Sequence, residues 1–130
     1  FCEMEYDENT YASIVNSIRR AKKGGYVFHY RAPVLIVAAN QKGYGNAMAD
    51  SSCALENMML MANALDLGSC WINQLHWLDE NRAIRDYLAQ FGIGDDETIC
   101  GALALGYADT ADGLPVREPL ARKDIRITRI

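Results

Sequence analysis

The polar residues best suited to binding a ligand occur where apolar segments of the sequence end. They are Asn46 in a loop with two glycines, Ile72, Asn73 and Gln74 in a short extended piece, and Arg122 and Lys123 near the end of the chain. Polar groups and backbone amides in an apolar setting are typical of sites that bind a flat heteroaromatic ring carrying a phosphate. Asparagine and glutamine also commonly satisfy loop backbone groups, so the spacing alone leaves both interpretations open.

Basic residues are concentrated in two stretches of an otherwise acidic chain. Five of the thirteen lysines and arginines lie in residues 19–31, and five more lie in the last fourteen residues. The net charge of −4 argues against a nucleic-acid partner, because proteins that bind nucleic acids need a basic surface. The basic tail is therefore either a solvated end of the chain or a site for one compact anion such as phosphate.

Cysteine and histidine give no sign of a metal site or of nucleophilic catalysis. The four cysteines (Cys2, Cys53, Cys70 and Cys100) form no C-x-x-C pair, and the chain has only two histidines. The sequence therefore shows no zinc or iron–sulfur motif, and neither histidine stands in a recognisable motif with serine or cysteine. We assign no catalytic side chain, and we expect reduced thiols and a cytoplasmic protein. No apolar run approaches the roughly 18 residues of a membrane span.

Hydrophobic periodicity and chain breakers predict an α+β fold in a single domain over residues 1–130. The expected elements are helices over 8–23, 51–66 and 80–90, buried strands over 34–39 and 98–107, an extended piece over 69–74, a loop over 40–49 and an edge strand over 124–130. We expect Asp50 and Asp79 to cap the second and third helices, because aspartate accepts hydrogen bonds from free backbone N–H groups. Gly101 and Ala104 indicate that a neighbouring element approaches the second buried strand closely.

The helix expected over residues 51–66 is apolar on almost every side. Only a few polar residues, such as Glu56, Asn57 and Asn63, interrupt its run of Ala, Leu and Met. A helix that is apolar all round must be buried all round. In a domain this small, the composition predicts that the helix packs against a partner subunit.

The order of five segments resembles the nitroreductase family. They are residues 32–37 (APVLIV), 43–46 (GYGN), 54–60 (ALENMML), 67–72 (LGSCWI) and 101–107 (GALALGY). The resemblance implies a nitroreductase-like FMN-binding fold, in which helices flank a central mixed or antiparallel sheet. It also implies an intertwined homodimer with FMN at the subunit interface, which accounts for the apolar helix.

The resemblance also assigns cofactor contacts by position. Ile72, Asn73 and Gln74 match the family segment that passes along the flavin ring, with backbone groups as the expected contacts. Arg122 and Lys123 match the basic residues that bind the FMN phosphate in this family. This assignment agrees with the anion site that the basic tail indicates.

A nitroreductase-like protein would pass a hydride from NAD(P)H through FMN to a nitroaromatic, a quinone or a similar small molecule by a ping-pong mechanism. Tyr44, Asn46 and Trp77 are the implied substrate contacts. The flavin carries the chemistry and solvent can supply protons, so no catalytic side chain is required. The alternatives are another flavin reaction on the same fold, by a dehydrogenase or a dehalogenase, and a flavin-free dimeric binding module.

The sequence departs from the family pattern near its start. Other FMN contacts in the family come from an Arg-Arg-Ser-x-Arg-like motif and a later Pro-Ser-x-x-Asn-x-Gln-like motif. Here Arg19 and Arg20 are followed by Ala21 and Lys22, and neither motif is present. We therefore expect the sequence to lack the N-terminal FMN-binding segment, an absence that favours the flavin-free alternative.

Overall fold

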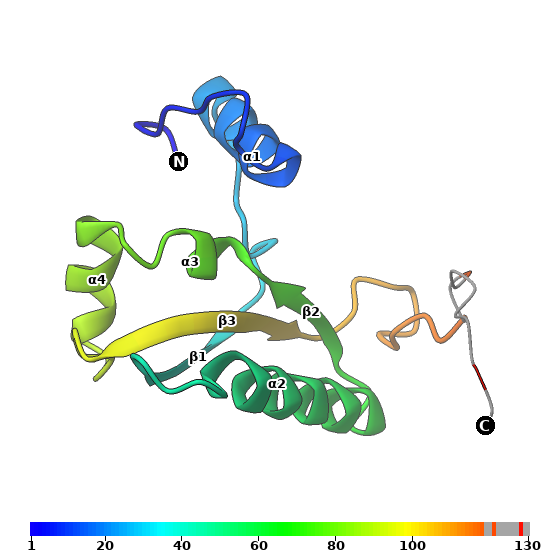
Figure 1. Cartoon of the computed structure of the whole chain (residues 1–130). Coiled ribbons are helices and arrows are strands. Elements are labelled where there is room, and N and C mark those ends of the chain that lie inside the picture. Colours follow the sequence, from blue (N-terminus) through cyan, green and yellow to red (C-terminus); the bar gives the residue numbers. More distant parts are fainter. Residues whose placement is uncertain (119–120, 122–127, 129–130) are drawn as a thin grey trace.

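The computed structural model describes residues 1–118, 121 and 128, and in that part it shows one sheet with helices on both faces (Figure 1). In chain order the elements are α1 (Ala12–Lys23), β1 (Val34–Gln41), α2 (Ala47–Ala64), β2 (Gly68–Ile72), α3 (Gln74–Trp77), α4 (Arg82–Ala89) and β3 (Glu97–Gly106). α2 covers one face of the sheet, α3 and α4 lie on the other, and α1 stands apart at the end of the linker 24–33. The predicted α+β architecture is confirmed.

β3 is the central strand of an antiparallel sheet with the order β1-β3-β2. Its residues 99–104 are buried, as expected of a strand whose apolar sequence is continuous. β1 pairs with β3 along its whole length, whereas β2 pairs only with the second half of β3. The last β2–β3 pair is Ile72 opposite Ala102, so among residues 1–118 the beginning of β3 has a strand on one side only.

A bulge in β3 decides which side chains face which layer. The register with β1 shifts between Ala38 and Ala39, so Cys100 has no partner in β1. An extra residue of this kind changes the face to which its neighbours point. Ile99 therefore packs into the core on the α3–α4 side, while Cys100 places its Sγ 3.6 Å from the carbonyl oxygen of Ala47 in α2.

The two layers of packing differ in how closely they approach β3. The core on the α3–α4 side consists of Ile72, Leu75, Leu88, Ile99, Ala102 and Ala104. On the other face, a Cβ added to Gly101 would lie 3.1 Å from Leu55 Cδ1 of α2 and 3.3 Å from the Trp71 ring. Only glycine leaves room for a helix at this separation. The close approach predicted at Gly101 is confirmed.

Several boundaries differ from those predicted from the sequence. The extended piece ends at Ile72, because Gln74 already begins α3. The loop over 40–49 is shorter than expected, since β1 continues to Gln41 by pairing with β3 and α2 begins at Ala47. α1 begins only at Ala12. The edge strand expected over 124–130 falls almost entirely outside the described residues.

The two predicted aspartate caps are wrong. Asn81 occupies the N-cap of α4, and its Oδ1 accepts a hydrogen bond from the Ile84 N–H at 3.2 Å. Asp79 is not free to cap a helix because its carboxylate belongs to a buried network. Asp50 lies inside the first turn of α2 and accepts a hydrogen bond from the Tyr44 hydroxyl at 3.0 Å.

In the single chain α2 is buried along one stripe only, and its burial by a partner subunit stays a prediction. The stripe consists of Ala47, Ser51, Leu55 and Ala62. Large apolar side chains on its other sides are exposed, namely Met48, Met58, Leu60, Met61 and Leu65. β1 was also expected to be buried, but it is an edge strand and its residues are half-buried or exposed. Neither α2 nor any other helix in the described part of the chain has the length and apolar character to cross a membrane.

Candidate functional site

The residues expected to run along a cofactor lie where β2 leaves the sheet and α3 begins. Ile72 as a whole residue is 1% exposed and belongs to the core, so its side chain is not available to a ligand. Asn73 stands at the N-cap of α3, and its carbonyl oxygen accepts a hydrogen bond from the Trp77 N–H at 3.3 Å. No side chain caps this first turn, although the first N–H groups of a helix lack partners within the helix. Ile72, Asn73 and Trp77 thus share one short segment with free backbone donors.

The side chain of Gln74 is committed to a contact within the chain. Its Nε2 donates a hydrogen bond to the Tyr26 hydroxyl at 3.2 Å, and that hydroxyl lies 3.1 Å from Ser17 Oγ in α1. These hydrogen bonds tie α1 and its linker to α3. Tyr26 lies 48 residues before Gln74, so sequence spacing offers no signal for this contact.

The far end of the same segment is bonded to the backbone of β3. His76 donates a hydrogen bond from Nδ1 to the carbonyl oxygen of Ile99 at 2.7 Å, since a carbonyl can only accept. Asp79 accepts the Ile99 N–H on Oδ1 at 2.9 Å and the Thr98 hydroxyl on Oδ2 at 2.7 Å. Both backbone groups of Ile99 are therefore held by side chains of one neighbouring segment.

Asp79 and Arg85 form a buried ion pair behind this segment. Arg85 Nη1 donates to Asp79 Oδ1 at 3.0 Å, and the two residues are only 6% and 9% exposed respectively. Arg85 Nη2 also bonds the carbonyl oxygen of Gly94. Burial raises the pKa of the Asp79 carboxyl. Hydrogen bonds from Thr98 and Ile99 and the charge of Arg85 outweigh burial, so the pKa lies below its ordinary value.

Two of the expected substrate contacts lie in the loop before α2. Asn46 is exposed at the N-cap of α2, and its carbonyl oxygen accepts a hydrogen bond from the Asp50 N–H at 2.9 Å. Tyr44 is 45% exposed, and its hydroxyl is bonded to the Asp50 carboxylate. The hydroxyl is therefore occupied, while the ring remains accessible to a ligand.

The bulge of β3 is the place where the two groups of predicted residues come nearest along the fold. Ala47, next to the loop, contacts Cys100 from the α2 face. His76 in α3 bonds the Ile99 carbonyl at the edge of β3. Both groups therefore adjoin one part of β3, one through α2 and the other through α3.

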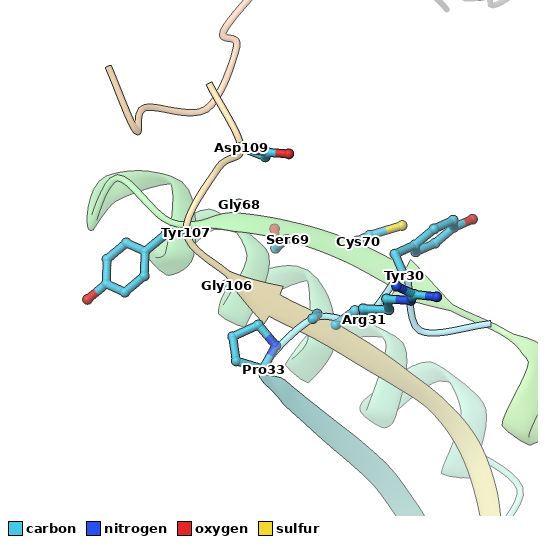
Figure 2. A pocket seen from close by; sticks show the side chains of 11 residues that line it. Tyr30, Arg31, Pro33, Gly68, Ser69, Cys70, Gly106, Tyr107 and Asp109 are labelled. Carbon is cyan, nitrogen blue, oxygen red and sulfur yellow. The ribbon is translucent and has the colours of Figure 1, made fainter. Parts of the chain in front are cut away.

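A groove that the sequence did not predict opens where β3 ends and β2 begins. It has a volume of about 530 Å³. Figure 2 shows its lining, which includes Tyr30, Arg31, Pro33, Gly68, Ser69, Cys70, Gly106, Tyr107 and Asp109. Tyr30 and Arg31 both have positive φ, at 54° and 59°. Sequence periodicity gives no signal for such a pair, because non-glycine residues rarely adopt this conformation.

A second hollow lies beside α2, one residue before the predicted cofactor segment. It has a volume of about 420 Å³ and is lined by Ser52, Cys53, Glu56, Asn57 and Trp71. Trp71 faces α2, because successive residues of a strand point to opposite faces and Ile72 points into the core on the other side. The polar residues that interrupt the apolar helix thus gather next to β2.

The basic tail is described only in part. Arg122 and Lys123, the predicted phosphate contacts, lie outside the described residues. Arg117 donates to the carbonyl oxygen of Asn63 at 2.8 Å and forms an ion pair with Asp66, which fastens the tail to the end of α2. Among the residues that the structure describes, no three His, Cys, Asp or Glu side chains gather closely enough to bind a metal ion.

Comparisons with known proteins place these features in a family context. The family model described as "Nitroreductase family" matches residues 3–107. The structure of a nitroreductase with bound FMN from Bacteroides fragilis is similar, with 35% identity, a TM-score of 0.68 and coverage of 80% of this chain. An FMN-dependent nitroreductase from Clostridium difficile is also similar, with 25% identity, a TM-score of 0.54 and coverage of 84%. The chain spans 55% and 65% of those two chains respectively. No curated protein gave a match.

Proposed function

The chain belongs to the nitroreductase family, and from this premise we propose that it acts as an FMN-dependent oxidoreductase. The observation that carries the proposal is the family match over residues 3–107. The likeness to a nitroreductase with bound FMN supports it, because that likeness extends over 80% of this chain. When bound, FMN supplies the acceptance and release of a hydride, so the protein has to bind and orient rather than react.

The end of β2 has the character that a flavin site requires. The first turn of α3 has backbone N–H groups that no side chain caps, and it rests on the buried side chains of Ile72 and Leu75. We assign Ile72, Asn73 and Gln74 to the ring through their backbone groups. The Gln74 side chain does not contribute, since Tyr26 already holds its amide. The apolar support beneath this turn excludes water from one side of the site.

Arg122 and Lys123 are our candidates for the FMN phosphate. Two adjacent cations suit a phosphate dianion, because charge-assisted hydrogen bonds are about twice as strong as neutral ones. The Arg117 contacts with Asn63 and Asp66 fasten the tail only five positions before Arg122. The tail therefore has a fixed starting point for reaching a ligand.

The exposed face of α2 supports a homodimer. Four large apolar side chains of α2 and Leu65 at its C-cap are exposed in the single chain, and exposed apolar side chains in such number on one helix are suited to an interface. Each such side chain contributes roughly 1.5–3 kcal/mol when fully buried. We propose that a second copy of α2 covers this face. The polar hollow around Trp71, Glu56 and Asn57 would then lie beside the interface.

We assign substrate contact to Tyr44, Asn46 and Trp77, with NAD(P)H as donor and a nitroaromatic, quinone or similar molecule as acceptor. The accessible ring of Tyr44 can stack on a flat substrate, while its bond to Asp50 fixes the direction of the ring. Tyr44 and Asn46 precede α2 and Trp77 ends α3, so the assignment requires that these two segments, from one chain or from the two chains of a dimer, meet at one ligand.

The decisive experiment is the absorbance spectrum of the purified protein, first as isolated and then after FMN is added and free FMN removed. A bound oxidised-flavin spectrum is expected, followed by bleaching when NADH or NADPH is mixed anaerobically in stopped flow. A protein that remains colourless contradicts the proposal and supports the flavin-free binding module. Bound flavin that neither nicotinamide reduces supports another flavin reaction on the same fold.

The phosphate assignment predicts a specific loss of affinity. The double variant Arg122→Gln, Lys123→Gln should bind FMN at least about tenfold more weakly, because hydrogen bonds to charged groups contribute roughly 1.5–3 kcal/mol each. The matched control is Arg126→Gln, Arg129→Gln, which removes the same charge from the same tail. Equal losses in both variants, measured by flavin fluorescence titration, would show a nonspecific charge effect instead.

A further inference from the structure

Within the described residues, side chains rather than another strand bond the edge of β3 that β2 leaves uncovered. β2 pairs with β3 as far as Ile72 opposite Ala102, and β3 extends five residues further toward its beginning, to Glu97. On that stretch the backbone groups directed away from β1 need other partners, because burying an unpaired N–H or C=O group is costly. The partners come from the segment that follows β2.

Ile99 is the point at which this segment is fastened. It is completely buried, and its carbonyl oxygen accepts the His76 Nδ1–H at 2.7 Å while its N–H donates to Asp79 Oδ1 at 2.9 Å. His76 lies within α3 and Asp79 lies two residues after α3 ends. Two side chains thus hold α3 against both backbone groups of a single residue.

The two hydrogen bonds from His76 and Asp79 to Ile99 form a clamp, and Asp79 is itself held by further hydrogen bonds. Thr98 donates its hydroxyl to the second carboxylate oxygen at 2.7 Å, and Arg85 donates to the first at 3.0 Å. Arg85 in turn bonds the carbonyl oxygen of Gly94, at the turn before β3. The carboxylate therefore cannot move without disturbing α4 and the beginning of β3.

The His76 half is coupled directly to the residues assigned to the flavin ring. Asn73 and Gln74 precede His76 by three and two residues, within one helical turn of about 3.6 residues. The Trp77 N–H, next to His76, donates to the Asn73 carbonyl oxygen at 3.3 Å. A displacement of His76 would therefore displace the backbone of Asn73 and Gln74 with it.

We propose that His76 and Asp79 are positioning residues, which clamp α3 to Ile99 and so hold the backbone of Asn73 and Gln74 in the orientation that FMN requires. Neither residue is proposed to touch the flavin, and both act through Ile99. The inference rests on the proposed function. Its physical basis is that a binding group must be held within a fraction of an ångström by the contacts behind it.

Exchange of His76 provides the test, with one variant that breaks the clamp and one that restores it. His76→Phe keeps a ring of similar shape but has no donor for the Ile99 carbonyl. His76→Asn keeps a donor, because its Nδ2 is attached to the same Cγ position as the imidazole Nδ1. Leu103→Val, on the α2 face of β3, is the control for a general loss of packing.

Three quantities are measured for each protein, namely backbone amide exchange of residues 73–77 without FMN, the dissociation constant for FMN, and the reduction potential of bound flavin. His76→Phe should raise the exchange rates and the dissociation constant about tenfold and shift the potential, because it leaves a buried acceptor unpaired. His76→Asn should stay within about threefold of the wild type. Leu103→Val should lower Tm and leave all three quantities unchanged.

The proposal is overturned if His76→Phe lowers Tm as Leu103→Val does while the three quantities stay at wild-type values. It is also overturned if His76→Asn fails to restore them. Should His76→Phe not fold, Asp79→Asn replaces it, since an amide oxygen still accepts the Ile99 N–H while the charge that fixes Arg85 is lost. For Asp79→Asn, smaller changes of the three quantities in the same direction are expected. Wild-type values of all three quantities would overturn the proposal. Wild-type protein that binds no FMN contradicts the proposed function, and amide exchange without FMN still decides whether His76 holds the segment.

Discussion

The two faces of the sheet differ in how their apolar side chains are buried. On the α3–α4 face, one chain supplies an apolar core and a buried network around Asp79 and Arg85, while Tyr87 and Phe91 at the end of α4 remain exposed. On the α2 face, one stripe of the helix packs against β3, and the remaining apolar side chains stay in water. The exposed apolar side chains of α2 are the surface that the proposed dimer would bury.

The difference also separates stability from assembly. A buried charge pair that keeps both partners is satisfied at all protein concentrations, whereas an exposed apolar helix is covered only when a second molecule is present. Changes on the α3–α4 face should therefore affect folding of the chain itself. Changes on the outer side of α2 should affect association and leave the fold intact.

The largest effect is expected from Asp79→Ala on the α3–α4 face. The variant leaves the Arg85 guanidinium buried without a counter-charge and the Ile99 N–H without an acceptor. Breaking a buried pair in this way typically costs about 3–5 kcal/mol of the free energy of unfolding. Urea denaturation followed by circular dichroism measures the loss.

Asp86→Ala is the matched control for this prediction. Asp86 also pairs with an arginine, Arg82, at 2.6 Å, but both side chains are largely exposed. Exposed pairs contribute little, so the midpoint of unfolding should hardly move. If the two alanine variants were equally stable, the network on the α3–α4 face would not be the stabilising feature described here.

The next effect is expected from Leu60→Glu on the outer side of α2. Leu60 is 59% exposed in the single chain, so a charge there should not disturb the fold. In a symmetric dimer the change enters the interface twice, and the dissociation constant should rise about 100-fold or more. Sedimentation velocity over a range of concentrations gives the constant, and the control is Tyr87→Glu on α4, where the native side chain is 58% exposed. A dimer unaffected by Leu60→Glu would place the interface elsewhere.

A smaller effect is expected when pH is lowered. The pKa of Asp79 in the folded protein lies below its ordinary value, so the carboxylate contributes stability that is complete above the unfolded value of about 3.9. That contribution is lost as the pH falls through the folded pKa. The difference in unfolding free energy between the wild type and Asp79→Asn should therefore shrink below about pH 4. A difference that stays constant from pH 7 to pH 3 would contradict this role of the charge.

Much of the fold could be predicted because it depends on local composition. The continuous apolar run of β3 predicts a buried strand, and Gly101 within it predicts the close approach of α2. Asp79 could not be assigned in this way. An aspartate before a helix has the sequence pattern of a cap. The hydrogen bonds to Asp79 nevertheless come from Ile99 and Thr98, about twenty residues away. The sequence could propose a segment for the site, whereas the hydrogen bonds that its side chains make within the chain depended on the fold.

By itself the sequence determined the elements, the family and the apolar character of α2, because propensity, periodicity and composition are properties of neighbouring residues. Only the tertiary structure decided that the side-chain amide of Gln74 bonds to Tyr26, which lies 48 residues away. The same holds for the groove at Tyr30 and Asp109, which the chain forms from three distant segments. The physical reason is that hydrogen bonds and cavities depend on which groups meet in space, and distant groups meet only after the chain has folded.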